Sequence, residues 1–232
     1  MGNVVAGGKV QRSENSKSGL SEQVYAFVKE QLLDGQYGPN DWILVDQISA
    51  RLSVSRQPVM DGLKRLAVAG LVTIVPQVGC RPCRYNVEEA VDFYRLFAEG
   101  EALLAGFAAE RAERNDLVKL RIISSEISEL VGRKRQNPAE LGRFYRSLNN
   151  VFHGQLHRMA RSPTVSNTVE IQRDLSDFFV AVAERPIFGN RLTEAHDEHE
   201  RIIKAVSAGD SARASKIMRG HVLAIADRLR AP

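Results

Sequence analysis

The sequence has few of the features that mark secreted or membrane proteins. Its 232 residues include only two cysteines and one tryptophan, and no apolar run approaches the ~18–20 residues of a membrane-spanning helix. The N-terminus shows neither a charged segment followed by an apolar core nor a cleavage site, so no secretory signal is expected. The net charge of +4 is modest, which permits a phosphate-binding surface without requiring one. We therefore expect a cytoplasmic protein with no membrane partner.

The two cysteines, Cys80 and Cys83, lie in a single Cys-Arg-Pro-Cys segment. A tetrahedral zinc site needs four ligands, and this segment supplies no others. A thioredoxin-like site needs its cysteine at a helix start, where the helix dipole lowers the thiol pKa, whereas this segment follows a β-branched run and indicates a hairpin. Two interpretations remain: the cysteines are incidental, or they form a redox switch that closes the hairpin.

The first part of the chain predicts a tail followed by two helices. Residues 1–19 are rich in glycine, serine, asparagine and lysine without periodicity, which predicts a disordered tail. A first helix is expected to begin at Ser21 and to end at Gly35, and a short second helix to cover residues 46–52.

The stretch from residue 52 to residue 71 predicts a third helix. Ser55 is a typical N-cap residue, Pro58 is tolerated in a first turn, and Gly70 ends the helix. Its apolar residues recur at helical spacing: Val59, Leu63, Leu66 and Ala67. A β-branched run through Val75 and a glycine at residue 79 then predict a hairpin. Taken alone, the helix could be an ordinary amphipathic helix with a solvated charged face.

The segment SRQPVMDGLKRLAVAGLVTIVPQVG resembles the winged-helix signature of the GntR family of bacterial transcription regulators, usually close to VSRTPVREALRRLEAEGLV followed by a PxxG wing. The resemblance covers about residues 20–84 and implies binding to a double-stranded DNA operator. The DNA-binding residues it implies are Gln47, Arg51, Ser55, Arg56, Gln57, Met60, Lys64 and Gly79, with Arg56 as the main base-reading side chain. Met60 replaces the usual arginine and cannot form the bidentate contact to guanine, worth roughly 1–3 kcal/mol of discrimination. A different operator or weaker binding is expected.

From residue 87 onward the periodicity is helical throughout. The predicted segments are 87–113, 115–136, 138–160, 163–184, 189–208 and 210–230. The Asn-Pro, Ser-Pro and Gly-Asp junctions place a capping residue where a helix should begin. The predicted fold is therefore mainly α, with a winged helix-turn-helix over residues 20–85 and an all-α bundle of about six helices over residues 86–232.

Three histidines of this half, His153, His199 and His221, each stand on an apolar helix face. A single histidine in such a place is usually a buried core residue. Three of them on three helices of one bundle favour a metal site, because imidazoles that project inward from facing helices are how bundles hold metals.

Two further segments, NNVFHGQLHRMARSP and DEHERIIKAVSAGDSARASKIMRGHV, resemble the FCD effector domain of the FadR branch of GntR regulators. Its usual motifs are close to DxxFHxxLxxxSxNP and EHxxIxxAIxxGDxxxAxxxMxxH, and the resemblance covers about residues 88–229. It implies a divalent metal ion (Zn, Ni or Mn), a small carboxylate effector, and four ligand positions: Asn149, His153, His199 and His221. Asn149 replaces the usual aspartate, so we expect weaker metal retention and stronger attraction of an anion. His157 and His196 lie near these positions but outside the motifs.

A second departure concerns the effector contact. Related proteins often have an arginine four residues before the glutamate that Glu101 matches, and Phe97 takes that place here. Arg95 is the nearby arginine, out of phase by one or two residues, and Arg95 and Asn149 are the predicted effector-binding residues.

The combined resemblance implies a dimeric, ligand-responsive regulator, usually a repressor in this family, that binds a palindromic operator and is not an enzyme. One alternative is a metal sensor in which the ion itself is the effector. Another is a three-histidine metal hydrolase. A hydrolase would also need a placed general base, and the acidic residues near His199 are Asp197, Glu198 and Glu200.

Overall fold

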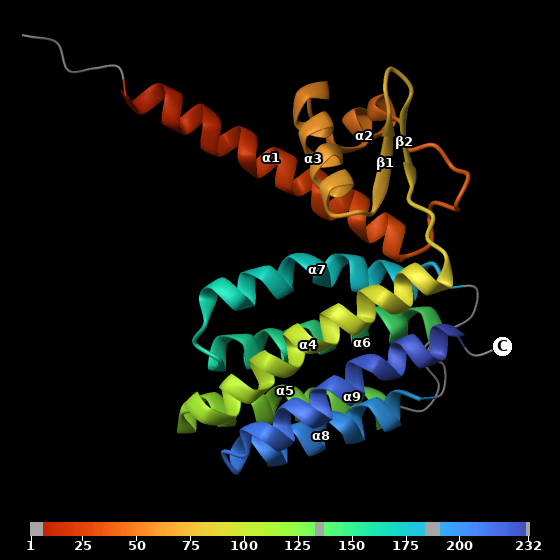
Figure 1. The fold of residues 1–232 in the computed structure, drawn as a ribbon. Coiled ribbons are helices and arrows are strands. Elements are labelled where there is room, and N and C mark those ends of the chain that lie inside the picture. The colour runs from red at the N-terminus through yellow and green to blue at the C-terminus, as the bar shows by residue number, and fades with distance from the viewer. Residues whose placement is uncertain (1–6, 133–136, 184–190, 231–232) are drawn as a thin grey trace, which may run out of the picture. The chain divides into compact units, whose positions relative to one another are not determined.

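The structure, a computed structural model, describes residues 7–132, 137–183 and 191–230. The chain divides into two compact units, residues 1–84 and 85–232, and each is described by itself (Figure 1). The predicted domain boundary lies within a residue or two of this division.

The N-terminal unit contains three helices and a two-stranded antiparallel hairpin. Its elements are α1 (Gly7–Leu33), α2 (Val45–Leu52), α3 (Arg56–Val68), β1 (Val72–Val75) and β2 (Gly79–Pro82). In the hairpin, Val72 pairs with Pro82 and Val75 with Gly79. Ile43, in the segment before α2, forms an isolated bridge with Cys80 and so ties the hairpin to the helices.

The core of this unit forms where α1 packs on α3. Both helices contribute apolar side chains that are almost fully buried: Val24, Val28 and Leu32 from α1, and Val59, Leu63 and Leu66 from α3. A Cβ atom on Gly62 would lie 2.7 Å from a methyl carbon of Val24, so the absence of a side chain there lets the two helices approach closely.

The first helix is longer than predicted. It begins at Gly7, so the structure contradicts the predicted disordered tail over residues 7–19, and Ser21 lies inside the helix instead of at its start. Helix formation is cooperative: once the half of α1 that packs on α3 is formed, each added residue gains one hydrogen bond. No proline interrupts residues 7–33, so the helix can continue. Residues 1–6 of the predicted tail lie outside the described residues.

The turns that flank α3 have the expected residues. Ser53 adopts a left-handed conformation between α2 and α3, and Gly70, with a φ of 79°, follows the end of α3 as predicted. Ser55 occupies the N-cap position of α3, but its side chain makes no capping hydrogen bond.

The second unit consists, over its described residues, of six helices. They are α4 (Val87–Arg111), α5 (Arg114–Gly132), α6 (Pro138–Met159), α7 (Pro163–Ala181), α8 (Leu192–Ser207) and α9 (Ser211–Arg230). All six predicted segments are present. Residues 133–136, 184, 189 and 190 of those segments lie outside the described residues. Asn86 and Glu89 form a reciprocal capping box that starts α4.

Helix α4 lies at the centre of the bundle, because it packs against α6, α7, α8 and α9 (Figure 1). Half of its buried residues are alanine, which allows close packing on several sides. A Cβ on Gly100 would lie 2.6 Å from a methyl carbon of Val169, so α4 and α7 approach closely beside Glu101. Among the described helices, none is both long and apolar enough to span a membrane.

Candidate functional site

The predicted DNA-reading residues lie on α2, on α3 and in the hairpin of the N-terminal unit. Six of them are exposed: Gln47, Arg51, Ser55, Arg56, Gln57 and Lys64. Met60 and Gly79 are half-buried. The start of α3 therefore presents a polar, solvent-facing surface opposite the face that packs on α1.

Several of these side chains form ion pairs or hydrogen bonds with carboxylates. The Nε atom of Arg56 lies 3.3 Å from an oxygen of Asp46 on α2. The amide nitrogen of Gln57 donates to Asp61 at 2.9 Å, and Lys64 lies 3.7 Å from the same carboxylate. Exposed ion pairs contribute less than about 1 kcal/mol each, so an approaching phosphate can replace these partners.

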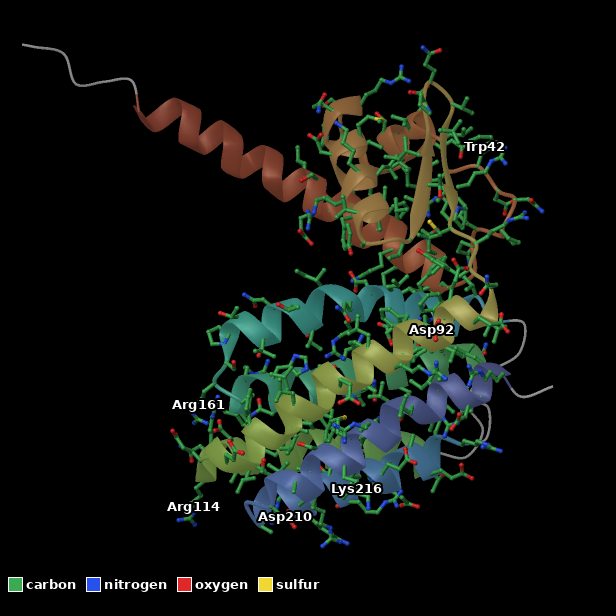
Figure 2. The ribbon with its side chains drawn as sticks, in the orientation of Figure 1. Trp42, Asp92, Arg114, Arg161, Asp210 and Lys216 are labelled. Carbon is green, nitrogen blue, oxygen red and sulfur yellow. The ribbon has the colours of Figure 1, made fainter. Side chains whose placement is uncertain are left out.

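Gly79 has a role within the hairpin. Its φ is +153°, and a Cβ there would lie 2.8 Å from the carbonyl oxygen of Ile43. The glycine is therefore required where the wing packs on the segment before α2. In that segment Trp42, which is labelled in Figure 2, is covered by Arg81, whose Cζ lies 3.7 Å from the ring centroid.

The structure contradicts the redox-switch interpretation of the cysteines. Cys80 is buried in β2, and burial raises the pKa of its thiol to about 12, which suppresses the reactive thiolate. Three residues along an extended chain span roughly 10 Å, whereas a disulfide needs Cα atoms within about 7 Å. Cys83 lies instead beside the hydroxyl of Thr73, at 3.4 Å. The cysteines are structural residues of the wing.

The second unit brings the three predicted histidines together. His153 of α6, His199 of α8 and His221 of α9 are buried, and one ring nitrogen from each lies within 4.8 Å of the others. The Nε2 atoms of His199 and His221 are 3.3 Å apart. Phe152 stacks on the His199 ring, with centroids 4.1 Å apart, and closes one side of this histidine cluster.

Burial keeps two of the imidazoles neutral. It lowers the pKa of His153 to about 4, in spite of the nearby Glu101 carboxylate, and it lowers the pKa of His199 well below its usual value. A metal ligand must offer an unprotonated nitrogen, so this protonation state is the one that coordination requires.

Carboxylates orient two of the three rings. The Nδ1 atom of His153 lies 2.9 Å from Glu101, and the Nδ1 atom of His221 lies 2.7 Å from Glu198. A ring that donates through Nδ1 keeps its Nε2 lone pair for a metal, and this arrangement is common around metal-bound histidines.

The fourth predicted ligand, Asn149, lies one helical turn before His153. It lines a cavity of about 30 Å³ whose wall also includes His153 and His221. Asn149 therefore faces the same space as two of the histidines.

Arg95 is not at this cavity. It is exposed on α4 and pairs with Asp92 at 3.0 Å, so the structure contradicts its predicted role in effector binding. The physical reason is the helix rotation: two residues turn the side chain by about 200°, so Arg95 points away from the side on which Phe97 lines the cavity. The cavity receives Arg173 of α7 and Arg228 of α9 instead.

Glu101 was named from the sequence only as a motif position, and its role was missed. It is buried, and its two oxygens contact the Nδ1 atom of His153 at 2.9 Å, the Nε2 atom of His157 at 3.2 Å and Arg173 at 2.9 Å. Burial opposes the charge on Glu101, but these partners outweigh burial and hold its pKa well below the usual value. His157 also lies 3.3 Å from Glu170, so it belongs to this charged network and not to the histidine cluster. A charged residue within the apolar stretch of α4 was the available signal.

Sequence models of two known families match the chain. The one described as FCD domain matches residues 92–224, and the one described as bacterial regulatory proteins, gntR family, matches residues 20–81. The HTH-type transcriptional repressor GlaR of Escherichia coli K12 is 25% identical over 205 residues, which cover 86% of this chain and 90% of GlaR. An HTH-type transcriptional regulator in an unstable DNA locus of Streptomyces ambofaciens is 26% identical over 88% of this chain and 82% of its own length.

Solved structures share the architecture. E. coli McbR/YncC matches with a TM-score of 0.71 at 17% identity, over 88% of this chain and 93% of that chain. A transcriptional regulator GntR from Rhodococcus sp. RHA1 matches with a TM-score of 0.69 at 17% identity, over 91% of this chain and 98% of that chain. The predicted fold, a winged helix-turn-helix followed by a helical bundle, is confirmed.

Proposed function

The chain belongs to the GntR family of bacterial regulatory proteins and carries an FCD domain, and from this membership and the two sites we propose that it is a ligand-controlled repressor. Family membership makes the chain a DNA-binding transcription regulator and not an enzyme. We infer that it binds a palindromic operator as a homodimer, and that a small carboxylate effector bound at a metal centre controls this binding.

The exposed start of α3 carries the DNA-binding part of the proposal. A helix-turn-helix places the N-terminal residues of its second helix against base edges in the major groove, and Arg56 and Gln57 occupy that place here. Two copies related by a twofold axis would read a palindrome. Leu96 and Leu103, both exposed on α4, offer apolar surface for such a dimer. The name of GlaR supports repression as the sign of control.

Selection from random-sequence duplexes tests this part. The full-length protein should enrich a sequence with two inverted half-sites about one helical turn apart. Binding to the enriched duplex should weaken steeply as salt rises, because phosphate contacts release counterions. Failure to enrich any sequence would contradict the proposal.

The histidine cluster supports the metal-binding part of the proposal. Three buried imidazoles converge, two of them are oriented by carboxylates, and imidazole nitrogens suit zinc and nickel. His153, His199 and His221 would hold the ion, with Asn149 beside them. The ion would supply positive charge that attracts the carboxylate of an effector, and Arg173 in the cavity wall supports the same attraction.

Replacing Glu198 with glutamine should weaken metal retention by about 10–100-fold, because an uncharged partner orients and polarises the His221 ring less strongly. Elemental analysis of protein purified without chelator, followed by competition with a chelator, measures the affinity. Glu194→Gln is the matched control, since Glu194 lies on the same helix and is exposed.

Equal metal affinity in both variants would argue against the oriented ligand set, and no uptake of added zinc, nickel or manganese by the unchanged protein would end the metal proposal. Titration of the ion against operator affinity, with and without organic acids, separates a metal sensor from an effector-controlled regulator. If the ion alone changes operator affinity, the ion is the effector.

A further inference from the structure

We propose that the effector carries an amino group as well as a carboxylate, and that Asp177 of α7 receives this amino group. The inference rests on the proposed effector site and names the class of molecule that fits it. The cavity between α4, α6, α7 and α9 is lined by both basic and acceptor side chains. Along α6 and α7, His153 and Arg173 lie about one helical turn from Asn150 and Asp177.

One level of the cavity wall contains Arg173 and His153. Arg173 and His153 are joined there through Glu101, which contacts both at 2.9 Å. With a metal on the histidine cluster, this level attracts a carboxylate strongly. Glu101 and Glu170 contact Arg173 at 2.9 and 3.2 Å and offset its charge, so the metal ion would supply most of the attraction at this level.

The next level, one helical turn away, carries acceptors. Asp177 follows Arg173 by four residues on α7, and Asn150 precedes His153 by three residues on α6, which is about 5 Å along each helix. The amide nitrogen of Asn150 donates to Asp177 at 2.8 Å, so these two residues are in direct contact in the cavity wall.

The acceptors at this second level are only partly satisfied. The amide oxygen of Asn150 is buried and has no hydrogen-bond partner among the described residues. A buried acceptor without a donor is costly, and an ammonium group brings three donors. Asp177 and the Asn150 oxygen together form a receptor for such a group.

The negative charge of Asp177 disfavours a dicarboxylate effector. A second carboxylate at this level would meet the Asp177 carboxylate, and like charges at short distance repel strongly in a half-buried site. Burial raises the pKa of Asp177 to about 6, whereas its hydrogen bond from Asn150 and the charges of Arg173 and Arg146 act in the opposite direction, so the group is mostly ionised at neutral pH. An amine is attracted where a second carboxylate is repelled.

The volume of the cavity limits how much of the effector it can enclose. Its 30 Å³ has room for about two or three water-sized groups. This suits the carboxylate and nearby amine of a short amino acid, with the two poles within one helical turn, and excludes a whole sugar acid.

The test compares matched ligands on the full-length protein supplied with zinc. Glycine, 3-aminopropanoate and 4-aminobutanoate are titrated by calorimetry and thermal shift against acetate, propanoate and butanoate, and against propanedioate and butanedioate. We expect at least one amino acid to bind about 10–100-fold more tightly than the matched acid without an amine, the range for a charge-assisted hydrogen bond. Tighter binding of a dicarboxylate, or equal binding of amino and simple acids, would overturn the inference while leaving a carboxylate-controlled regulator intact.

Asp177→Asn is the decisive variant. It should remove most of the preference for amino acids and relieve the repulsion of dicarboxylates, whereas Asp174→Asn, the same change on the same helix, should leave the preference unchanged. An unchanged preference in Asp177→Asn would overturn the assignment. If none of these acids binds the unchanged protein, the proposed effector site fails together with the inference, although operator selection can still succeed. The ligand preference of the unchanged protein decides for or against an amino-acid effector even if the variant does not fold.

Discussion

Replacing Glu101 with alanine will lower the free energy of unfolding of the helical domain by about 3–5 kcal/mol, the range for removing one partner of a buried ion pair. Glu101 is only 1% exposed and Arg173 only 6%. Alanine would leave the Arg173 guanidinium with Glu170, at 3.2 Å, as its remaining ion-pair partner among the described residues. It would also remove the acceptor of His153 and of His157.

Glu99→Ala is the matched control. Glu99 lies two residues away on the same helix and pairs with Arg219 through two contacts, at 2.7 and 2.8 Å, but both side chains are well exposed. Surface pairs of this kind contribute less than about 1 kcal/mol. The comparison therefore isolates burial, because both variants remove a glutamate that is bonded to an arginine.

Urea unfolding of the full chain at one protein concentration measures both variants. Far-UV circular dichroism follows mainly the helical domain, which holds most of the helical residues, whereas the single tryptophan, Trp42, reports on the N-terminal domain. The Glu101→Ala midpoint should fall by circular dichroism and change little by tryptophan fluorescence. If the two alanine variants proved equally stable, the charged network would not be the main polar support of the bundle.

Replacing Arg56 with alanine will weaken binding to the selected operator roughly 10–100-fold, since a bidentate arginine–guanine contact is worth about 1–3 kcal/mol. Arg56 is the first residue of α3, and 73% of its side chain is exposed. The variant should also relax base preference at one position of each half-site while binding to unrelated duplexes falls much less.

Arg65→Ala provides the control for charge. Arg65 lies on the same helix, but its guanidinium pairs with Glu22 of α1 at 2.6 Å and stacks on Tyr25. The change removes the same charge from the same domain and should weaken all duplexes alike, without altering base preference. Fluorescence anisotropy with the selected duplex and a scrambled duplex, at two salt concentrations, separates the two effects. A uniform loss in Arg56→Ala would assign this residue to phosphate and not to base contact.

The elements of the fold could be predicted because their signals are local. Gly70 follows α3, a proline begins each of α6 and α7, and Asn86 caps α4, so helix ends were readable within a few residues. The length of α1 could not be read in this way. Its first turns have no apolar periodicity, and they are helical because a later part of the same helix packs on α3.

The candidate site was predictable only in part. Motif positions identified His153, His199 and His221, and the structure brings these three rings together. Arg95 was predicted as the arginine nearest to the motif position, although it is out of phase with that position, and α4 turns it away from the cavity.

By itself, the sequence determined the order of the helices, the identity of the reading helix and the three histidines, because periodicity, capping residues and motif spacing are properties of neighbouring residues. Only the tertiary structure decided that Arg173, His153 and His157 meet on Glu101, and that Asp177 faces Asn150. These partners lie between 27 and 72 residues apart. Whether such residues meet depends on how each helix is rotated about its axis and packed on its neighbours, and no local pattern encodes that rotation.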